Sequence, residues 1–163
     1  MLLKEYENPN NFLAATRCKL EENEAANNLM LGLLEGLQEN PLRYGSPPLM
    51  GTVGDDLIVL MTPPHTLQLY VCGPNPDFDS VADHLLKGDW PVPGIIAARE
   101  TAERFSAIWQ EQTGCSSQVK MNMRIYRLDA VSPLPKILGG VRQAEENDIN
   151  QLAVWASSFS ETA

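Results

Sequence analysis

The sequence has few of the residues that mark exported, membrane-spanning or metal-binding proteins. Its three cysteines are widely spaced and it has only two histidines, so neither a disulfide framework nor a zinc site is indicated. It has no run of about eighteen apolar residues, and its first residues do not form a basic segment followed by an apolar one. We therefore expect a cytoplasmic protein without a metal ion and without a membrane partner.

Basic residues are also scarce. Twelve Lys and Arg stand against 21 Asp and Glu, which gives a formal net charge of −9 at pH 7. An acidic chain repels a phosphate backbone, so we expect no nucleic acid partner. Hydrophobic residues make up 44% of the 163 residues, which is enough for one sizeable core.

Local signals predict a mixed α/β domain. The sequence Asn8-Pro9-Asn10 offers a helix cap and a proline suited to a first turn, and apolar residues then recur at helical spacing. The expected elements are, in chain order, helices at about 10–20 and from Glu22–Glu24 to Asn40, strands at 49–53, 57–62 and 67–72, a helix capped by Asp77 or Asp79, a strand near 95–96, and a helix that Gly114 ends.

Residues 119–126 alternate between apolar and polar side chains. This is the two-residue period of a long strand with one buried face. The other face carries Arg124 and Tyr126. These two side chains would line a cleft shared with a second domain, or they would face solvent, as one side of an antiparallel sheet often does.

The end of the chain predicts the start of a second structural unit. A proline-rich stretch lies at 132–135 without a helical or strand pattern, which is typical of a boundary. We expect a first domain at 1–131, a linker at 132–137, and the first strand and helix of a truncated second domain at 138–163.

The expected terminal helix has one apolar face that needs a covering surface. This partner-facing stripe consists of Ile149, Leu152, Ala156 and Phe159. Glu146 and Asp148 place negative charge in the first turn, where the helix dipole favours it. We expect the stripe to meet either further residues of a longer protein or a second copy of the chain.

The motif Arg142-x-Ala144-x-x-x-Asp148, followed by an apolar-periodic helix, resembles the opening strand and first helix of GNAT-type N-acetyltransferases, and the preceding order of elements resembles that fold. The chain is similar to the first half, plus a stub, of bacterial proteins with two tandem GNAT-like halves, in which the N-terminal half is degenerate and the C-terminal half holds acetyl-coenzyme A. The resemblance implies a mostly antiparallel mixed sheet flanked by about four helices, with a C-terminal strand-helix stub. It also implies a non-catalytic part of an N-acetyltransferase for an amine acceptor.

The chain departs from that family where the cofactor would bind. The family holds the pyrophosphate with backbone amides of an Arg/Gln-x-x-Gly-x-Gly/Ala turn between the fourth strand and the third helix. Residues 72–77 stand there as Cys-Gly-Pro-Asn-Pro-Asp, whose prolines lack amide donors and whose aspartate repels anions. We therefore expect no bound acetyl-coenzyme A and no catalytic residue in this chain, with the cofactor in the C-terminal half.

Several side chains are candidates for sites. Cys72 would be a nucleophile if the following helix lowered the pKa of its thiol, but packing within a strand explains it better, because no histidine is near in sequence. Ser80, Asp83 and His84 share one expected helix in directions that do not converge, which favours a solvated face.

Asn27 and Asn28 follow Glu24 at the start of the second helix. The resemblance puts this region near the place where the acceptor enters, so they are candidate ligand contacts. Solvent-exposed residues of a first helical turn explain them as well, because they do not by themselves define a pocket.

A second class of function stays open at this point. The chain would then be a stand-alone binding or scaffold module that keeps the acetyltransferase-like fold without catalysis. Its terminal helix would dock on a partner or on a second copy, most simply as a dimer. A Gly-rich cofactor turn encoded beyond Ala163 would favour the enzyme, and an immediate stop would favour the module.

Overall fold

The computed structural model describes residues 2–133 and 139–162. It divides into two compact units, Met1–Arg127 and Leu128–Ala163. The expected boundary at residue 131 and linker at 132–137 stay predictions, and most of that linker lies outside the described residues.

The first unit is built on one five-stranded mixed sheet. Its strands are β1 (Leu3–Glu5), β2 (Leu49–Val53), β3 (Leu57–Met61), β4 (Leu67–Val71) and β5 (Ile95–Ile96). They lie in the order β1-β2-β3-β4-β5, antiparallel throughout except for the parallel pair β4 and β5. The expected mixed α/β class and the meander of three strands are confirmed.

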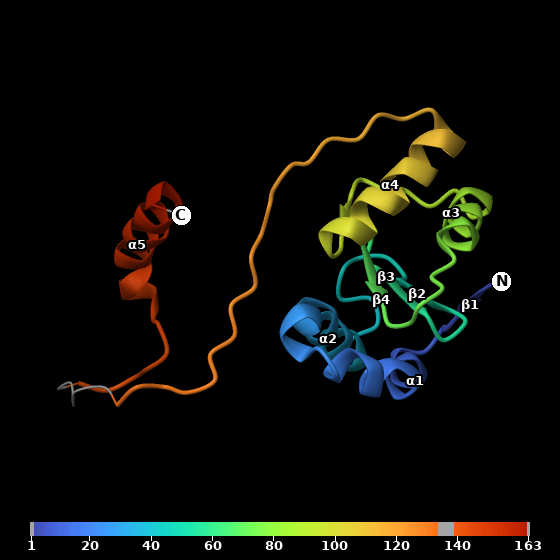
Figure 1. Ribbon diagram of the computed structural model, residues 1–163. Coiled ribbons are helices and arrows are strands. Elements are labelled where there is room, and N and C mark those ends of the chain that lie inside the picture. Colours follow the sequence, from blue (N-terminus) through green and yellow to red (C-terminus); the bar gives the residue numbers. More distant parts are fainter. Residues whose placement is uncertain (1, 134–138, 163) are drawn as a thin grey trace. The chain divides into compact units, whose positions relative to one another are not determined.

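Helices cover both faces of this sheet, as Figure 1 shows. Helices α1 (Pro9–Glu21) and α2 (Glu24–Glu39) lie on one face, and α3 (Phe78–Lys87) and α4 (Arg99–Thr113) lie on the other. Because side chains alternate along a strand, each face has its own core. The core under α1 and α2 contains Phe12, Leu34, Met50, Ile58 and Leu60, and the core under α3 and α4 contains Leu57, Val59, Leu67, Phe78 and Phe105.

The helix ends follow the expected local chemistry. The side chain of Asn8 accepts hydrogen bonds from the amides of Asn10 and Asn11, at 2.8 and 3.4 Å. Asp77 caps α3 by accepting from the Ser80 amide at 3.0 Å. Gly114 ends α4 with φ of 72°, the left-handed conformation that glycine adopts most easily.

The prediction of a long strand at 119–126 is wrong. These residues form no strand, and their apolar side chains are exposed. Alternation sets which side chains share a face, but a strand exists only when a neighbouring strand pairs with its backbone. The short edge strand β1, by contrast, was not expected from the sequence.

The second unit contains a 3-10 turn, η1 (Glu146–Asp148), and helix α5 (Ile149–Thr162). The expected helix is therefore confirmed. Gly139–Glu145 form no strand, so the expected strand ahead of it is wrong over the described residues, while Leu138 lies outside them.

The two ends of the Arg142-to-Asp148 motif contact each other. The Arg142 guanidinium donates to both carboxylate oxygens of Asp148, at 2.6 and 2.9 Å. Asp148 also accepts from the Glu145 amide at 2.8 Å. This bidentate pair lowers the pKa of the Asp148 carboxyl and fixes the chain at the entrance to α5.

Across the described part of the chain, no helix combines the length and the apolar character needed to cross a membrane.

Candidate functional site

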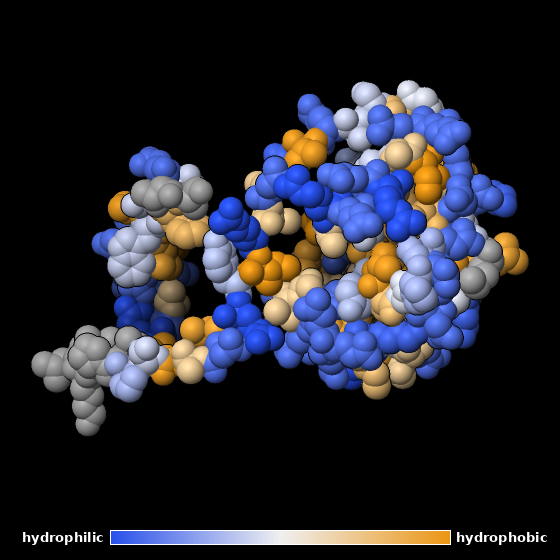
Figure 2. Space-filling view, in the orientation of Figure 1, coloured by the Kyte–Doolittle hydropathy of each residue, from blue (hydrophilic) through white to orange (hydrophobic). Residues whose placement is uncertain are grey.

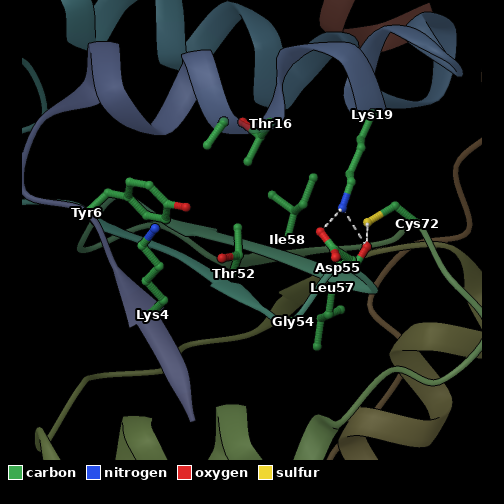
Figure 3. Close-up of a pocket in the computed structure, with 11 residues that line it drawn as sticks. Lys4, Tyr6, Thr16, Lys19, Thr52, Gly54, Asp55, Leu57, Ile58 and Cys72 are labelled. Carbon is green, nitrogen blue, oxygen red and sulfur yellow. Dashed lines mark hydrogen bonds and ion pairs between the residues drawn. The ribbon is translucent and has the colours of Figure 1, made fainter. Parts of the chain in front are cut away.

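A cavity of about 310 Å³ opens between α1 and the sheet. Figure 3 shows α1 above it and the strands below, with polar side chains entering from both sides. The residues that line it are Lys4, Tyr6, Ala15, Thr16, Lys19, Thr52, Gly54, Asp55, Leu57, Ile58 and Cys72. They come from β1, α1, the β2–β3 hairpin and the end of β4, so the cavity is formed by segments far apart in the sequence.

At one end of the cavity, Lys19 bridges α1 to the hairpin turn. Its ammonium group donates to the backbone oxygen of Asp55 at 2.7 Å and to the Asp55 carboxylate at 2.8 Å. The thiol of Cys72 donates to the same backbone oxygen at 3.2 Å. These interactions are drawn as dashed lines in Figure 3.

The charges at this end stabilise one another. The hydrogen bond to Asp55 raises the pKa of Lys19, and the same bond lowers the pKa of Asp55. Both groups stay ionised at neutral pH. Because Asp55 is exposed to solvent, the pair contributes little to the free energy of unfolding.

Cys72 is not an activated thiol in this setting. Burial raises its pKa, an effect that the nearby Lys19 ammonium only partly offsets. Its side chain is half buried beside the core under α1 and α2. These features support the interpretation of Cys72 as a packing residue.

We expect alkylation to separate the three cysteines. Cys18 and Cys115 are exposed, whereas Cys72 is half buried with a raised pKa. Iodoacetamide at pH 7.5 should therefore modify Cys72 severalfold more slowly than the other two, as followed by peptide mass spectrometry. If Cys72 reacted first, it would be a thiolate and the cavity would be a candidate catalytic site.

At the other end of the cavity, Lys4 projects from β1. Its ammonium group lies 4.7 Å from the centroid of the Tyr6 ring, and its register partner on β2 is Thr52. Lys4 and Thr52 at this end supply an ammonium and a hydroxyl donor to a small polar or anionic group. The lining includes neither His nor Glu, and the Cys72 thiol donates to a backbone oxygen and not to a side-chain base.

A second, more open cavity of about 380 Å³ lies along α1 and α2. It is lined by Arg17, Glu21, Glu24, Asn28, Leu31, Gly32 and Glu35. Arg17 donates to Glu21 at 2.9 Å, which leaves an excess of carboxylates around the opening. Such a lining attracts a cation.

The two asparagine candidates occupy different environments. Asn27 is buried, and its side-chain amide donates to the backbone oxygen of Leu20 at 3.0 Å, which joins the end of α1 to α2. Asn28 is exposed and lines the second cavity with Glu24. A contact of either residue with a ligand stays a prediction.

The Ser80, Asp83 and His84 set does not form a catalytic array. The Ser80 hydroxyl donates to Asp77 at 2.7 Å, and the Asp83 carboxylate lies 3.9 Å from the Lys87 ammonium. His84 Nε2 lies 2.7 Å from Glu5 and so connects α3 to β1. His65 is a loop residue whose ring contacts Tyr44 edge-on.

The remaining candidates lie in exposed segments. Arg124 and Tyr126 are exposed, in the stretch that forms no strand. In α5 the stripe residues Ile149, Leu152, Ala156 and Phe159 are all exposed. Their proposed contacts with a second domain stay predictions.

The loop that follows β4 is closed to an anion. Gly73 packs so tightly on Asp56 that a Cβ atom there would overlap the carboxylate. Asp77 already accepts the Ser80 amide at the start of α3 and places its own negative charge there. A phosphate at this helix end would therefore meet carboxylates and prolines where it needs amide donors.

Within residues 2–133 and 139–162, no group of three or more His, Cys, Asp and Glu side chains is arranged to hold a metal ion. No protein-family model matches the sequence, and neither a curated protein nor a solved structure matches the chain significantly.

Proposed function

We propose that the chain is the N-terminal, non-catalytic part of an acetyl-CoA-dependent N-acetyltransferase, with acetyl-coenzyme A bound by another domain. The observation that carries this proposal is the order and pairing of its elements. Two helices precede an antiparallel meander, and α3, β5 and α4 then follow in a mostly antiparallel mixed sheet. This order resembles that of a GNAT domain from α1 to α4, without the expected strand at 119–126 and with β1 added ahead of α1.

The loop after β4 supports the non-catalytic half of the proposal. A pyrophosphate bound at a helix start depends on free amides and on the positive end of the helix dipole. Here Pro74 and Pro76 remove two amides and the Asp77 side chain accepts a third from Ser80. The cofactor would therefore bind elsewhere in the protein.

The cavity along α1 and α2 supports an amine as the acceptor. Glu24 and Glu35 line it without an ion pair among the described contacts, and Asn28 adds an amide. A protonated amine is attracted to such a cluster, and it would then have to lose a proton in the catalytic domain before it attacks the thioester. In this role the chain captures and orients the acceptor.

Two titrations of the chain test the proposal. Acetyl-coenzyme A should give no saturable heat in isothermal calorimetry, whereas spermidine should bind weakly, with an affinity that falls as salt increases. The double variant Glu24→Gln/Glu35→Gln should lose most of the spermidine binding. A matched variant, Glu100→Gln/Glu103→Gln on α4, removes the same charge from another surface and should bind as the unaltered chain does.

Two results would contradict the proposal. Stoichiometric, tight binding of acetyl-coenzyme A would show that the chain carries its own cofactor site. Equal loss of spermidine binding in both double variants would show that only the net charge matters, and not the α1–α2 cavity.

The alternative of a binding or scaffold module draws support from α5. Its large apolar side chains are exposed, including Ile149 at 61% and Phe159 at 73%. Exposed apolar side chains at helical spacing are typical of a helix that docks on another surface. Such a module would bind neither acetyl-coenzyme A nor spermidine.

A further inference from the structure

The sheet of the first unit is incomplete at its β5 edge. Strand β5 has two residues and pairs with β4 on one side, so among the described residues the backbone groups on its other side face no strand. The core on the α3 and α4 face is incompletely covered near this strand. The apolar residues that are only partly buried against it include Ile95 of β5, Val92 and Ala97 on either side of that strand, and Ile108 and Trp109 of α4.

The chain carries a segment with the pattern of a missing strand. We call residues 115–127 the arm. Its apolar side chains Val119, Met121, Met123 and Ile125 alternate with polar ones and are 57–72% exposed. Figure 2 shows hydrophobic and hydrophilic side chains following one another at the surface along this extended segment.

The arm contacts its own helix α4 through polar bonds that do not use its apolar face. Gln110 donates to the Ser117 hydroxyl at 2.9 Å, and Arg99 donates to the Asn122 side chain at 2.9 Å. Neither bond covers an apolar side chain of the arm. Among the described residues, the arm therefore pairs with no strand, and the outer edge of β5 has no neighbouring strand.

Charge favours docking of the arm on the body of the same protein. The arm contains Lys120, Arg124 and Arg127 and no acidic residue, whereas residues 1–114 contain sixteen acidic and seven basic side chains. A cationic segment is attracted to an anionic body, and two anionic bodies without their arms would repel each other.

We propose that the arm of each copy adds as a strand to the β5 edge of the other copy, so that two copies exchange arms. Main-chain hydrogen bonds between the arm and β5 extend the sheet, as in other cases of strand addition. The apolar face of the arm then covers Ile95 and Trp109, and its polar face stays in solvent. Because each copy offers one arm and one edge, the exchange closes as a symmetric dimer.

Sedimentation equilibrium of the chain at micromolar concentration tests this inference. We expect twice the chain mass, and an apparent dissociation constant that rises with salt because the arm and body attract each other by charge. The variant Met121→Ser/Met123→Ser should weaken the dimer about tenfold or more, since it removes apolar side chains from both exchanged arms.

Two controls separate strand addition from other causes. Gln118→Ser/Asn122→Ser changes the polar face of the arm and should leave the dimer intact. Met121→Pro removes an amide donor and blocks a ladder, so it should also give monomers, with an unchanged circular dichroism spectrum because the arm is exposed.

A monomer in the unaltered chain would overturn the inference. So would a dimer that survives all the arm variants and is lost in Leu152→Ser/Phe159→Ser, because α5 would then form the interface. The titrations with acetyl-coenzyme A and spermidine do not depend on this result, so the proposed function and the exchange of arms are tested separately.

Discussion

Phe105→Ala should lower the free energy of unfolding by about 3–5 kcal/mol, the range for removing a buried aromatic side chain. Phe105 lies on α4 and is fully buried. Its ring lies edge-on to Phe78 of α3, with centroids 6.3 Å apart, and stacks on Trp109 at 6.1 Å. Its loss would leave a cavity among α3, α4 and the sheet.

Urea denaturation followed by fluorescence measures this effect. Leu42→Ala is a suitable control because Leu42 is 60% exposed, and its variant should stay within about 0.5 kcal/mol of the unaltered chain. A Phe105 variant as stable as the control would show that α4 does not pack on the sheet as described.

Gly73→Ala should lower the free energy of unfolding by about 1–3 kcal/mol, because an added methyl group has no space. A Cβ atom at this position would overlap the Asp56 carboxylate and approach the Asp56 Cα to 3.0 Å. The Cys72 amide donates to the Asp56 backbone oxygen at 2.8 Å, so the two segments cannot easily separate. The substitution therefore forces the loop after β4 away from the hairpin turn.

Two further variants serve as a control for Gly73→Ala and as a second change that should restore its stability. Gly32 lies in α2, where an added Cβ would contact nothing within 4 Å, so Gly32→Ala should raise the free energy of unfolding by about 0.5–1 kcal/mol. Asp56→Gly should restore part of the stability of Gly73→Ala, since it removes the overlapping carboxylate. A neutral Gly73→Ala, measured by urea denaturation, would show that the loop is open enough to admit a ligand.

Elements that end in a strong local signal were predictable from the sequence. Asn8 and Asp77 cap helices because their short side chains reach the first free amides. Gly54 and Gly114 adopt positive φ values of 55° and 72°, as the turns after β2 and α4 require. These signals act over a few residues, so the helix ends and turns that they determine can be predicted without knowledge of the rest of the fold.

Features that depend on distant partners were not predictable. Strand β1 has three residues, two of them charged, and it exists because Lys4 and its neighbours pair with β2. Residues 119–126 have a better strand pattern and form none, since no strand in the described chain pairs with them. In both cases pairing with a distant strand decides whether the segment becomes a strand, and the periodicity of the sequence does not reveal that pairing.

Most residues of the candidate site could not be predicted from the sequence. The cavity under α1 draws Lys4, Lys19, Thr52 and Cys72 from four separate segments, with no motif that connects them. Glu24 and Asn28 were recognisable as a polar cluster because they are four residues apart on one helix. The contact of Glu21 and Glu35 with the same cavity depends on how α1 packs on α2.

The position of β1 has a consequence for how the protein is made. Leu3 pairs with Val53, so β1 is synthesised some fifty residues before the strand with which it pairs. Helices α1 and α2 can form in that interval because their hydrogen bonds are local, and the β2–β3 hairpin needs only a short turn. We therefore expect the sheet to form from the β2–β3 hairpin outwards, with β1 among the last strands to pair.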